Sequence, residues 1–196
     1  MMTHDIMPKV IETNRCILRP FKKGDDKAMF LNWCQDPRVT EHLTWFPHRS
    51  KEETKAILEM WLQNYQDAPF YHWGIVLKEN QALIGSIGLV KYSDAHARGE
   101  VGYCIAYDYW HQGITSEALK AIITYLFTDI GFNKLYARHI KENGASGKVM
   151  QKCGMKQESI MRQDVRHKDG RFVDMVSYAI LKEDFLKTYE VDTFFD

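Results

Sequence analysis

A glycine and two hydroxyl residues stand where an apolar strand gives way to a strongly helical segment (YWHQGITSEALKA, residues 109–121). The first amides of a helix lack backbone partners and carry a partial positive charge. Gly113 lets the backbone approach a ligand or adopt a positive φ, and the hydroxyl groups of Thr115 and Ser116 can form hydrogen bonds. This pattern is typical of a phosphate cradle. The alternative is a plain turn capped by Thr115 or Ser116, which is the commoner use of such residues.

Other reactive side chains have spacings that argue against the chemistry they suggest. The GASGK segment (144–148) lacks the glycine spacing of an NTP-binding P-loop, and Val149 follows its lysine. The eight histidines show no spacing typical of a metal site, so we expect no metal. Cys104 or Cys153 could act with His139 as a nucleophile, but cysteines in apolar segments more often serve as small core residues.

The composition is that of one globular domain without a strongly charged partner surface. Of 196 residues, 45% are hydrophobic and 27% are charged, which is enough for a sizeable core. The 26 basic residues balance the 26 acidic ones, and this disfavours nucleic-acid binding, which depends on a basic excess. Four cysteines without a CxxC pair indicate free thiols, and no segment resembles a signal peptide or a membrane span. We therefore expect a cytoplasmic protein without a membrane partner.

Alternation, helical spacing and turn residues predict interspersed strands and helices. Strands are expected at residues 16–21, 71–78, 82–92, 100–110, 135–140, 156–166 and 172–181. Helices are expected at residues 26–34, 51–65, 116–130, 145–153 and 182–189. Ser50 and Glu53 form a capping box, Pro37 is expected to lie beyond the first helix, and Gly131 ends the helix that precedes it. Because most strands follow one another as hairpins, the sequence indicates an α+β or mixed-sheet α/β domain.

Residues 109–119 (YWHQGITSEAL) resemble motif A of the GNAT acetyltransferases, in the form found in the RimJ/RimL-like branch of ribosomal-protein N-terminal acetyltransferases. Trp110 occupies the position of the Gln or Arg that opens motif A, as is usual in this branch, and Thr115 replaces a small Gly or Ala. The resemblance runs from about Ile11 to Phe185, nearly the whole chain. The further matching segments, in the family's order, are IETNRCILRPF, WCQDPRVTEHL, GEVGYCI, NGASGKVMQKCGM and DMVSYAIL.

This resemblance implies a single GNAT acetyltransferase domain over residues 1–196, with a core at about 11–185 and a splayed mixed sheet flanked by helices. It also implies acetyl-CoA as the co-substrate. The strand with Tyr103, Cys104 and Ile105 would pair with the pantetheine arm, because parted strands expose backbone groups that a ligand amide can satisfy. The amides of Gln112, Gly113, Ile114, Thr115 and Ser116 would hold the pyrophosphate, and His111 is a further residue expected to bind the cofactor.

Acetylating an amine requires a neutral amine, a polarised thioester carbonyl and a proton for the leaving thiolate. A backbone N–H near Cys104 or Ile105 is expected to meet the carbonyl. By the resemblance, Glu100 is the general base and acts through water, and Ser146 lies close to the CoA sulfur as the acid. The alternatives are a solvated strand-end glutamate and a helix N-cap. Asn143 would bond the pantetheine, or otherwise is a turn residue.

The acceptor is the part that the sequence leaves open. The family builds its acceptor groove from the first helices and their connecting loop, so Trp45 and Trp33 are candidate acceptor contacts, with core anchors as the alternative. The acceptor itself ranges from a protein N-terminus to a polyamine, an aminoglycoside or another small amine. Relatives of this kind often dimerise, so a homodimer is among the partners that the resemblance implies.

The resulting prediction is an N-acetyltransferase that moves acetyl from acetyl-CoA to a primary amine by direct attack, without an acyl-enzyme. A catalytically idle acetyl-CoA-binding sensor or interaction module is the alternative, and retention of Glu100 and Ser146 favours the enzyme. A phosphate-binding NTPase is disfavoured by the missing P-loop.

Overall fold

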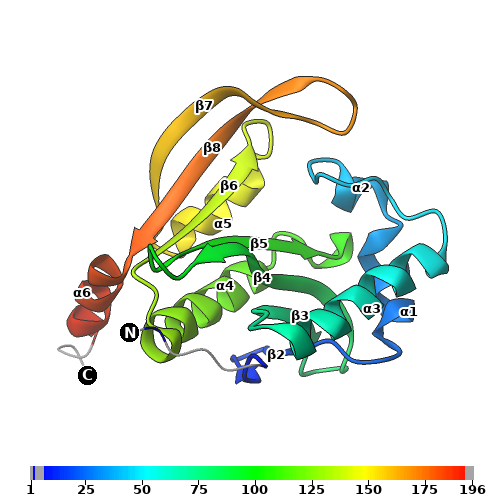
Figure 1. The fold of residues 1–196 in the computed structure, drawn as a ribbon, viewed down its shortest axis with the longest axis horizontal. Coiled ribbons are helices and arrows are strands. Elements are labelled where there is room, and N and C mark those ends of the chain that lie inside the picture. The colour runs from blue at the N-terminus through cyan, green and yellow to red at the C-terminus, as the bar shows by residue number, and fades with distance from the viewer. Residues whose placement is uncertain (1, 3–6, 193–196) are drawn as a thin grey trace.

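The computed structural model describes residues 2 and 7–192, which form a mixed eight-stranded sheet flanked by helices (Figure 1). Across the sheet the strands follow the order β1-β2-β3-β4-β5-β6-β8-β7. The strands are β1 (Ile11–Glu12), β2 (Cys16–Arg19), β3 (His72–Leu77), β4 (Leu83–Ser93), β5 (Arg98–Ile105), β6 (Lys134–Ile140), β7 (Lys156–Arg166) and β8 (Phe172–Leu181). The helices are α1 (Asp25–Met29), α2 (Pro37–Thr40), α3 (Lys51–Asp67), α4 (Ile114–Tyr125), α5 (Gly144–Lys152) and α6 (Lys182–Asp192). Segments Phe30–Cys34 and Leu126–Ile130 continue α1 and α4 as π-helical turns.

The sheet has two halves that meet only at the base of β5 and β6. These strands run parallel and pair only where Arg98–Glu100 lies beside Lys134–Tyr136. Beyond that point β5 stays paired with β4, and β6 stays paired with β8. Each strand is therefore held by its own half of the sheet, and the two diverge. In Figure 1 the β6–β8–β7 half diverges from β5, as the resemblance predicts, and we call the V-shaped gap between these two strands the opening.

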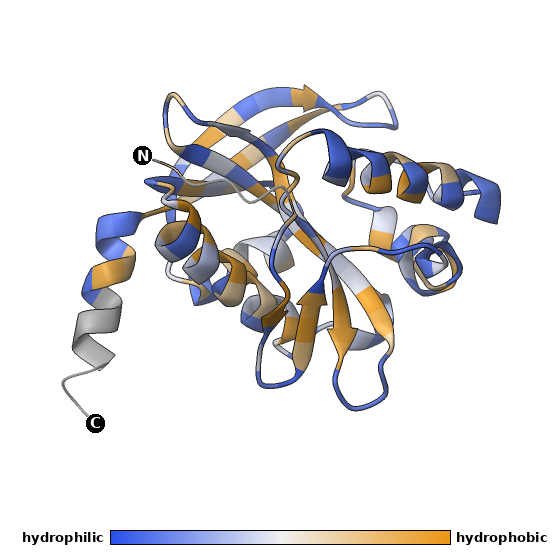
Figure 2. Ribbon diagram, turned by 60° about the horizontal axis from the view of Figure 1, so that its bottom comes forward, coloured by the Kyte–Doolittle hydropathy of each residue, from blue (hydrophilic) through white to orange (hydrophobic). Residues whose placement is uncertain are grey.

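Two hydrophobic clusters hold the helices on the two faces of the sheet. On one face α4 buries a stripe that includes Leu119 and Ile122 against the central strands. On the other face, Trp33 and Leu58 from the first helices pack with Val76 of β3. Alternating side chains of each strand supply both clusters, which is why the central strands are apolar along their length (Figure 2).

The connection between β5 and α4 differs from the prediction. A strand was expected to run to residue 110, but β5 ends at Ile105 and a 3₁₀ turn covers Tyr107–Tyr109. The indole nitrogen of Trp110 donates to the Ile105 carbonyl oxygen at 2.9 Å, so the chain must fold back on the strand end. Pro37 lies beyond the first helix as predicted, since that helix ends at Cys34, but it also starts the unpredicted helix α2 behind an Asp36 cap.

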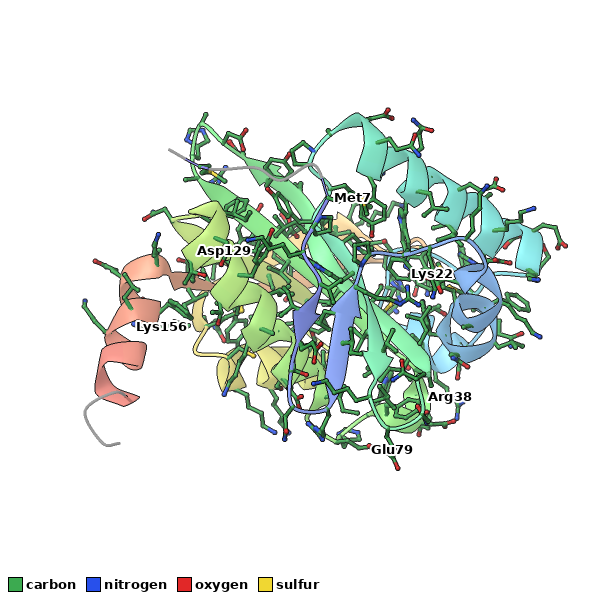
Figure 3. The ribbon with its side chains drawn as sticks, turned by 90° about the horizontal axis from the view of Figure 1, so that it is seen from below. Met7, Lys22, Arg38, Glu79, Asp129 and Lys156 are labelled. Atoms are coloured by element: carbon green, nitrogen blue, oxygen red, sulfur yellow. The ribbon has the colours of Figure 1, made fainter. Side chains whose placement is uncertain are left out.

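Several charged side chains labelled in Figure 3 are exposed: Glu79 at the β3–β4 turn, Asp129 in the π-helical turn after α4 and Lys156 at the start of β7. Glu100, in contrast, is buried. Among residues 2 and 7–192, no helix has both the length and the apolarity needed to cross a bilayer.

Candidate active site

The opening between β5 and β6 exposes one edge of β5 inside the molecule. From Val101 to Ile105 this edge has no strand partner on the β6 side, whereas β4 pairs with the other edge. Buried backbone amides and carbonyls without partners are costly, so a bound extended ligand with its own amides would be stabilised here. The residues predicted to meet pantetheine, Tyr103, Cys104 and Ile105, all lie on this stretch.

Residues 111–116, here called the 111–116 turn, follow this edge and lead into α4. His111 and Gly113 both have left-handed backbones, with φ values of 59° and 76°. Helix α4 begins at Ile114 with Gly113 as N-cap and without a side-chain cap, so Thr115 and Ser116 do not serve as caps. The alternative of a capped turn is thus not what the chain adopts. Left-handed residues beside a helix start direct amide N–H groups to one side, and such concavities bind anions.

Gly113 is required for its conformation and leaves open space in front of it. A Cβ added there would meet no atom closer than Arg15 Nη2 at 3.7 Å. Glycine is therefore favoured at this position because of its positive φ and not because a larger side chain would clash with a neighbouring atom.

A clamp from the β1–β2 turn fixes the 111–116 turn from outside. Glu117 in the first turn of α4 accepts from Arg15 Nε at 2.7 Å, from the Arg15 amide at 2.7 Å and from the Thr13 hydroxyl at 2.6 Å. Arg15 Nη1 also donates to the Gln112 carbonyl oxygen at 2.9 Å. Burial acts to raise the pKa of Glu117, but the bonds from Thr13 and Arg15 outweigh it and lower that pKa. The carboxylate thus stays ionised and locks the turn to the sheet edge.

Ser146 and Tyr103 meet at the mouth of the opening. The side chain of Asn143 caps α5 by accepting from the Ser146 amide at 3.3 Å, so Ser146 is not the cap. The Ser146 hydroxyl instead lies 2.9 Å from the Tyr103 hydroxyl, which also donates to the Ser146 carbonyl oxygen at 3.0 Å. Burial raises the pKa of Tyr103. One hydroxyl pair therefore links β5 to α5 across the opening.

Glu100 lies at the vertex where the two halves of the sheet meet. Its side chain is buried, with Arg138 Nε at 2.9 Å from one carboxylate oxygen and Lys91 Nζ at 3.1 Å from the other. The alternative of a solvated strand-end glutamate does not describe this position. An acceptor ammonium would bring a further positive charge to a carboxylate that two cations already contact.

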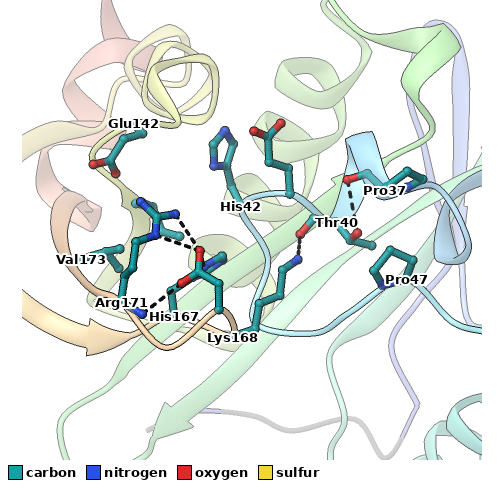
Figure 4. A pocket seen from close by; sticks show the side chains of 12 residues that line it. Pro37, Thr40, His42, Pro47, Glu142, His167, Lys168, Arg171 and Val173 are labelled. Carbon is teal, nitrogen blue, oxygen red and sulfur yellow. Dashed lines mark hydrogen bonds and ion pairs between the residues drawn. The ribbon is translucent and has the colours of Figure 1, made fainter.

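A pocket of about 530 Å³ lies between the α2 loop and the β7–β8 hairpin, and we call it the hairpin pocket (Figure 4). It is lined by Pro37, Thr40, Glu41, His42, Pro47, Ile140, Glu142, His167, Lys168, Asp169, Arg171 and Val173. Its inner wall is the end of β6, which continues through Glu142 into the Asn143 cap of α5. The pocket therefore borders the end of β6 and the short segment that leads from it to α5.

Lys168 joins the two walls of the hairpin pocket. Its ammonium group donates a hydrogen bond to the backbone carbonyl oxygen of Thr40 (Figure 4). It donates a second one to the carbonyl oxygen of Trp45 at 3.0 Å. Burial lowers the pKa of Lys168. This contact could not be predicted from the sequence, because Lys168 lies in a hairpin turn whose residues are typical of solvent-exposed loops.

The two predicted acceptor tryptophans do not line the hairpin pocket. Trp33 is 1% exposed and belongs to the core between α1 and the sheet, so in this structure it has no surface to offer a ligand. Trp45 is half-buried, and its ring lies 5.2 Å from that of His48. Trp45 accepts a hydrogen bond from Lys168 through its carbonyl oxygen, and of the loop between α2 and α3 it is His42 and Pro47 that line the pocket.

The thiols take part in local packing. Cys153 donates to the Ser116 carbonyl oxygen at 3.3 Å, and burial raises its pKa to about 12. Cys104 lies 3.4 Å from the Ser86 hydroxyl, and burial raises its pKa as well. His139 contacts the Ile140 carbonyl oxygen instead of either thiol. In the part of the chain that the structure describes, no group of three or more His, Cys, Asp or Glu residues could hold a metal ion.

Comparisons with known proteins assign this arrangement to a family. The model of the acetyltransferase (GNAT) domain matches residues 15–156. The uncharacterized N-acetyltransferase YoaA of Bacillus subtilis (strain 168) is 30% identical, over 88% of this chain and 97% of its own. The putative ribosomal N-acetyltransferase YdaF of the same strain is 26% identical, over 71% of this chain and 74% of its own.

Solved structures agree with the fold. A GNAT-family acetyltransferase from Bacillus anthracis superposes with a TM-score of 0.79 at 25% identity, over 89% of this chain and 99% of that one. The spermidine N-acetyltransferase of Vibrio cholerae, solved in complex with CoA and spermine, superposes with a TM-score of 0.74 at 20% identity, over 86% and 96% of the two chains.

Proposed function

Because this chain belongs to the GNAT acetyltransferase family, we propose that it transfers acetyl from acetyl-CoA to a primary amine by direct attack. The observation that carries the proposal is the unpaired edge of β5, which runs from Glu100 past Ser146 toward an uncapped helix N-terminus at Gly113. A thioester with a long amide-bearing arm and a diphosphate has the chemistry to occupy both ends of this path. An idle acetyl-CoA sensor would have the same binding path, so catalysis has to be tested separately.

Acetyl-CoA would lie along β5, with its pantetheine amides on Tyr103–Ile105 and its pyrophosphate at the 111–116 turn. The two left-handed residues beside the start of α4, His111 and Gly113, support this orientation. The side chain of Asn143 caps α5, so Asn143 would affect pantetheine binding by fixing the position of that helix. The CoA complex of the structural neighbour from Vibrio cholerae agrees with the choice of ligand.

The acceptor would enter from the hairpin pocket, on the far side of the opening from the 111–116 turn. Its nitrogen attacks the thioester carbonyl carbon, the C–S bond breaks, and the amine proton leaves toward Glu100, directly or through water. A backbone N–H near Cys104 or Ile105 would polarise the carbonyl. Ser146 would give a proton to the departing thiolate, so protons balance over the reaction.

The acceptor is proposed as a primary amine on a small molecule or a protein N-terminus. One structural neighbour carries spermine and one relative is named a putative ribosomal acetyltransferase, and both names describe amine acceptors. A pocket of about 530 Å³ falls in the usual size range for a small ligand or the first residues of a peptide. The four free cysteines are in keeping with a cytoplasmic location, which we also propose.

A turnover screen tests the function. Acetyl-CoA is incubated with the protein and a panel of polyamines, aminoglycosides and N-terminal peptides, while CoA release and acetylated product are measured. We expect acetylated product from at least one primary amine. Tight acetyl-CoA binding without any acetylated amine would support the idle module instead.

A further inference from the structure

The hydroxyl of Tyr103 is the one side-chain group that contacts Ser146 Oγ among the described residues. Tyr103 lies on β5 and Ser146 in the first turn of α5, so the contact joins elements that are far apart in the chain. The Tyr103 oxygen is 2.9 Å from Ser146 Oγ and 3.0 Å from the Ser146 carbonyl oxygen. The sequence prediction assigned Tyr103 only a backbone role, as part of the strand that pairs with pantetheine.

The two hydroxyl groups can share their protons in only two ways. If Tyr103 donates to the carbonyl oxygen of Ser146, the serine proton points at the tyrosine oxygen and is not available to a ligand. If Tyr103 donates to Ser146 Oγ, the serine proton is free to point elsewhere. Because burial raises the pKa of Tyr103, its hydroxyl keeps its proton at neutral pH and can donate in either arrangement.

We infer that Tyr103 is a positioning residue that makes Ser146 competent as the acid, an inference that rests on the proposed function. By donating to Ser146 Oγ in place of the Ser146 carbonyl oxygen, Tyr103 turns the serine proton toward the sulfur as the C–S bond breaks. The S–H bond forms at the expense of the serine O–H bond, and the tyrosine bond stabilises the negative charge that develops on Ser146 Oγ. The proton lost by the acceptor amine restores the balance through solvent, so no further reactant is needed.

A matched control exists on the same helix. The Tyr178 hydroxyl accepts from Gln151 of α5 at 3.0 Å, so Tyr178→Phe also removes a largely buried tyrosine hydroxyl that bonds α5. It does not touch Ser146. A role of Tyr103 that merely steadied α5 would be reproduced by this control, whereas a role in directing the serine proton would not.

The test compares kcat and KM for Tyr103→Phe, Ser146→Ala, their double variant and Tyr178→Phe. We expect Tyr103→Phe to lower kcat by about tenfold, the factor expected for one hydrogen bond of ordinary net strength, with the KM for acetyl-CoA unchanged. Tyr178→Phe should keep its kcat, and the double variant should be no slower than Ser146→Ala, because Tyr103 acts only through Ser146.

Three results would overturn the inference in distinguishable ways. Full activity of Tyr103→Phe, or additive losses in the double variant, would show that Tyr103 does not position Ser146, while leaving Ser146 as the acid. Full activity of Ser146→Ala would remove the proposed acid as well. The slow hydrolysis of acetyl-CoA, measured on the same variants, gives the same comparison without an acceptor, so a failed amine screen still leaves Tyr103 testable.

Discussion

The two ends of the opening between β5 and β6 are built on different principles. The 111–116 turn is one continuous segment whose shape comes from two left-handed residues and a helix start. The hairpin pocket is assembled from the α2 loop and the β7–β8 hairpin, which Lys168 joins across more than a hundred residues of chain. A ligand at the first end would be held mainly by backbone, and a ligand at the second by side chains. Mutation can therefore change the acceptor end without disturbing the cofactor end.

The largest expected effect is at the vertex that both ends share. Glu100→Gln should lower kcat/KM by about 10²- to 10⁴-fold, the usual contribution of a general base, with acetyl-CoA binding little changed. Glu158→Gln is the control, since Glu158 also pairs with a β6 cation, Lys134 at 2.7 Å, but lies outside the opening. Steady-state kinetics on an identified acceptor measures both. Near-full turnover of Glu100→Gln would mean that the amine loses its proton to bulk water.

A second, smaller effect separates the two ends. Lys168→Met removes both bonds to the α2 loop, so the walls of the hairpin pocket should part and the KM for the acceptor should rise by about tenfold. The dissociation constant of acetyl-CoA should stay the same. Lys141→Met, which removes an exposed lysine paired with Asp174, controls for loss of charge.

The Trp45→Ala variant keeps the backbone carbonyl oxygen that accepts from Lys168, so it should lower acceptor affinity less than Lys168→Met does. Equal losses for acceptor and acetyl-CoA would show that the ends are not independent.

The smallest effect concerns the clamp on the 111–116 turn. The folded pKa of Glu117 is lowered below its ordinary value of 4.5, so its carboxylate stabilises the fold above that pH and loses this contribution as pH falls through the folded pKa. Glu117→Gln should thus lower the melting temperature at pH 7 and make it less sensitive to acid between about pH 5 and 3. Acetyl-CoA affinity should fall severalfold. A variant with the wild-type acid dependence would show that the clamp is not the titrating group.

Most of the fold followed from local patterns in the sequence. The Ser50 cap, the left-handed Gly131 after the α4 stripe and the β7–β8 hairpin were all predicted and are confirmed. The other half of the predicted capping box differs, because the Glu53 carboxylate accepts from the Arg49 amide instead of the Ser50 amide. The misses come from short elements and from tertiary contacts. Helix α2 escaped because Pro37 was interpreted as a stop signal, although Pro after an Asp cap equally starts a helix.

The parts of the candidate site that come from one continuous segment could be predicted from the sequence, and contacts between distant segments could not. The 111–116 turn could be read from Gly113 and its hydroxyl neighbours, and Glu100 and Ser146 from the family motifs. The partners of these residues could not, since nothing local in the sequence relates Arg15 to Glu117 or Tyr103 to Ser146. Such contacts depend on the order of strands in the sheet and on where the sheet splits.

Calorimetric titration of acetyl-CoA into the Gly113→Val protein tests whether the 111–116 turn binds the cofactor. Gly24 provides a matched control, because it is also a left-handed helix N-cap, with φ of 91°, and an added Cβ there meets no atom within 4 Å. Both substitutions force a branched residue into a conformation that costs about 1–2 kcal/mol, but only one of them reshapes the 111–116 turn. With both proteins folded by circular dichroism, we expect Gly113→Val to weaken acetyl-CoA binding by at least about tenfold, or 1.4 kcal/mol, and Gly24→Val to bind normally. Wild-type affinity in a folded Gly113→Val protein would contradict the assignment of this turn to the cofactor.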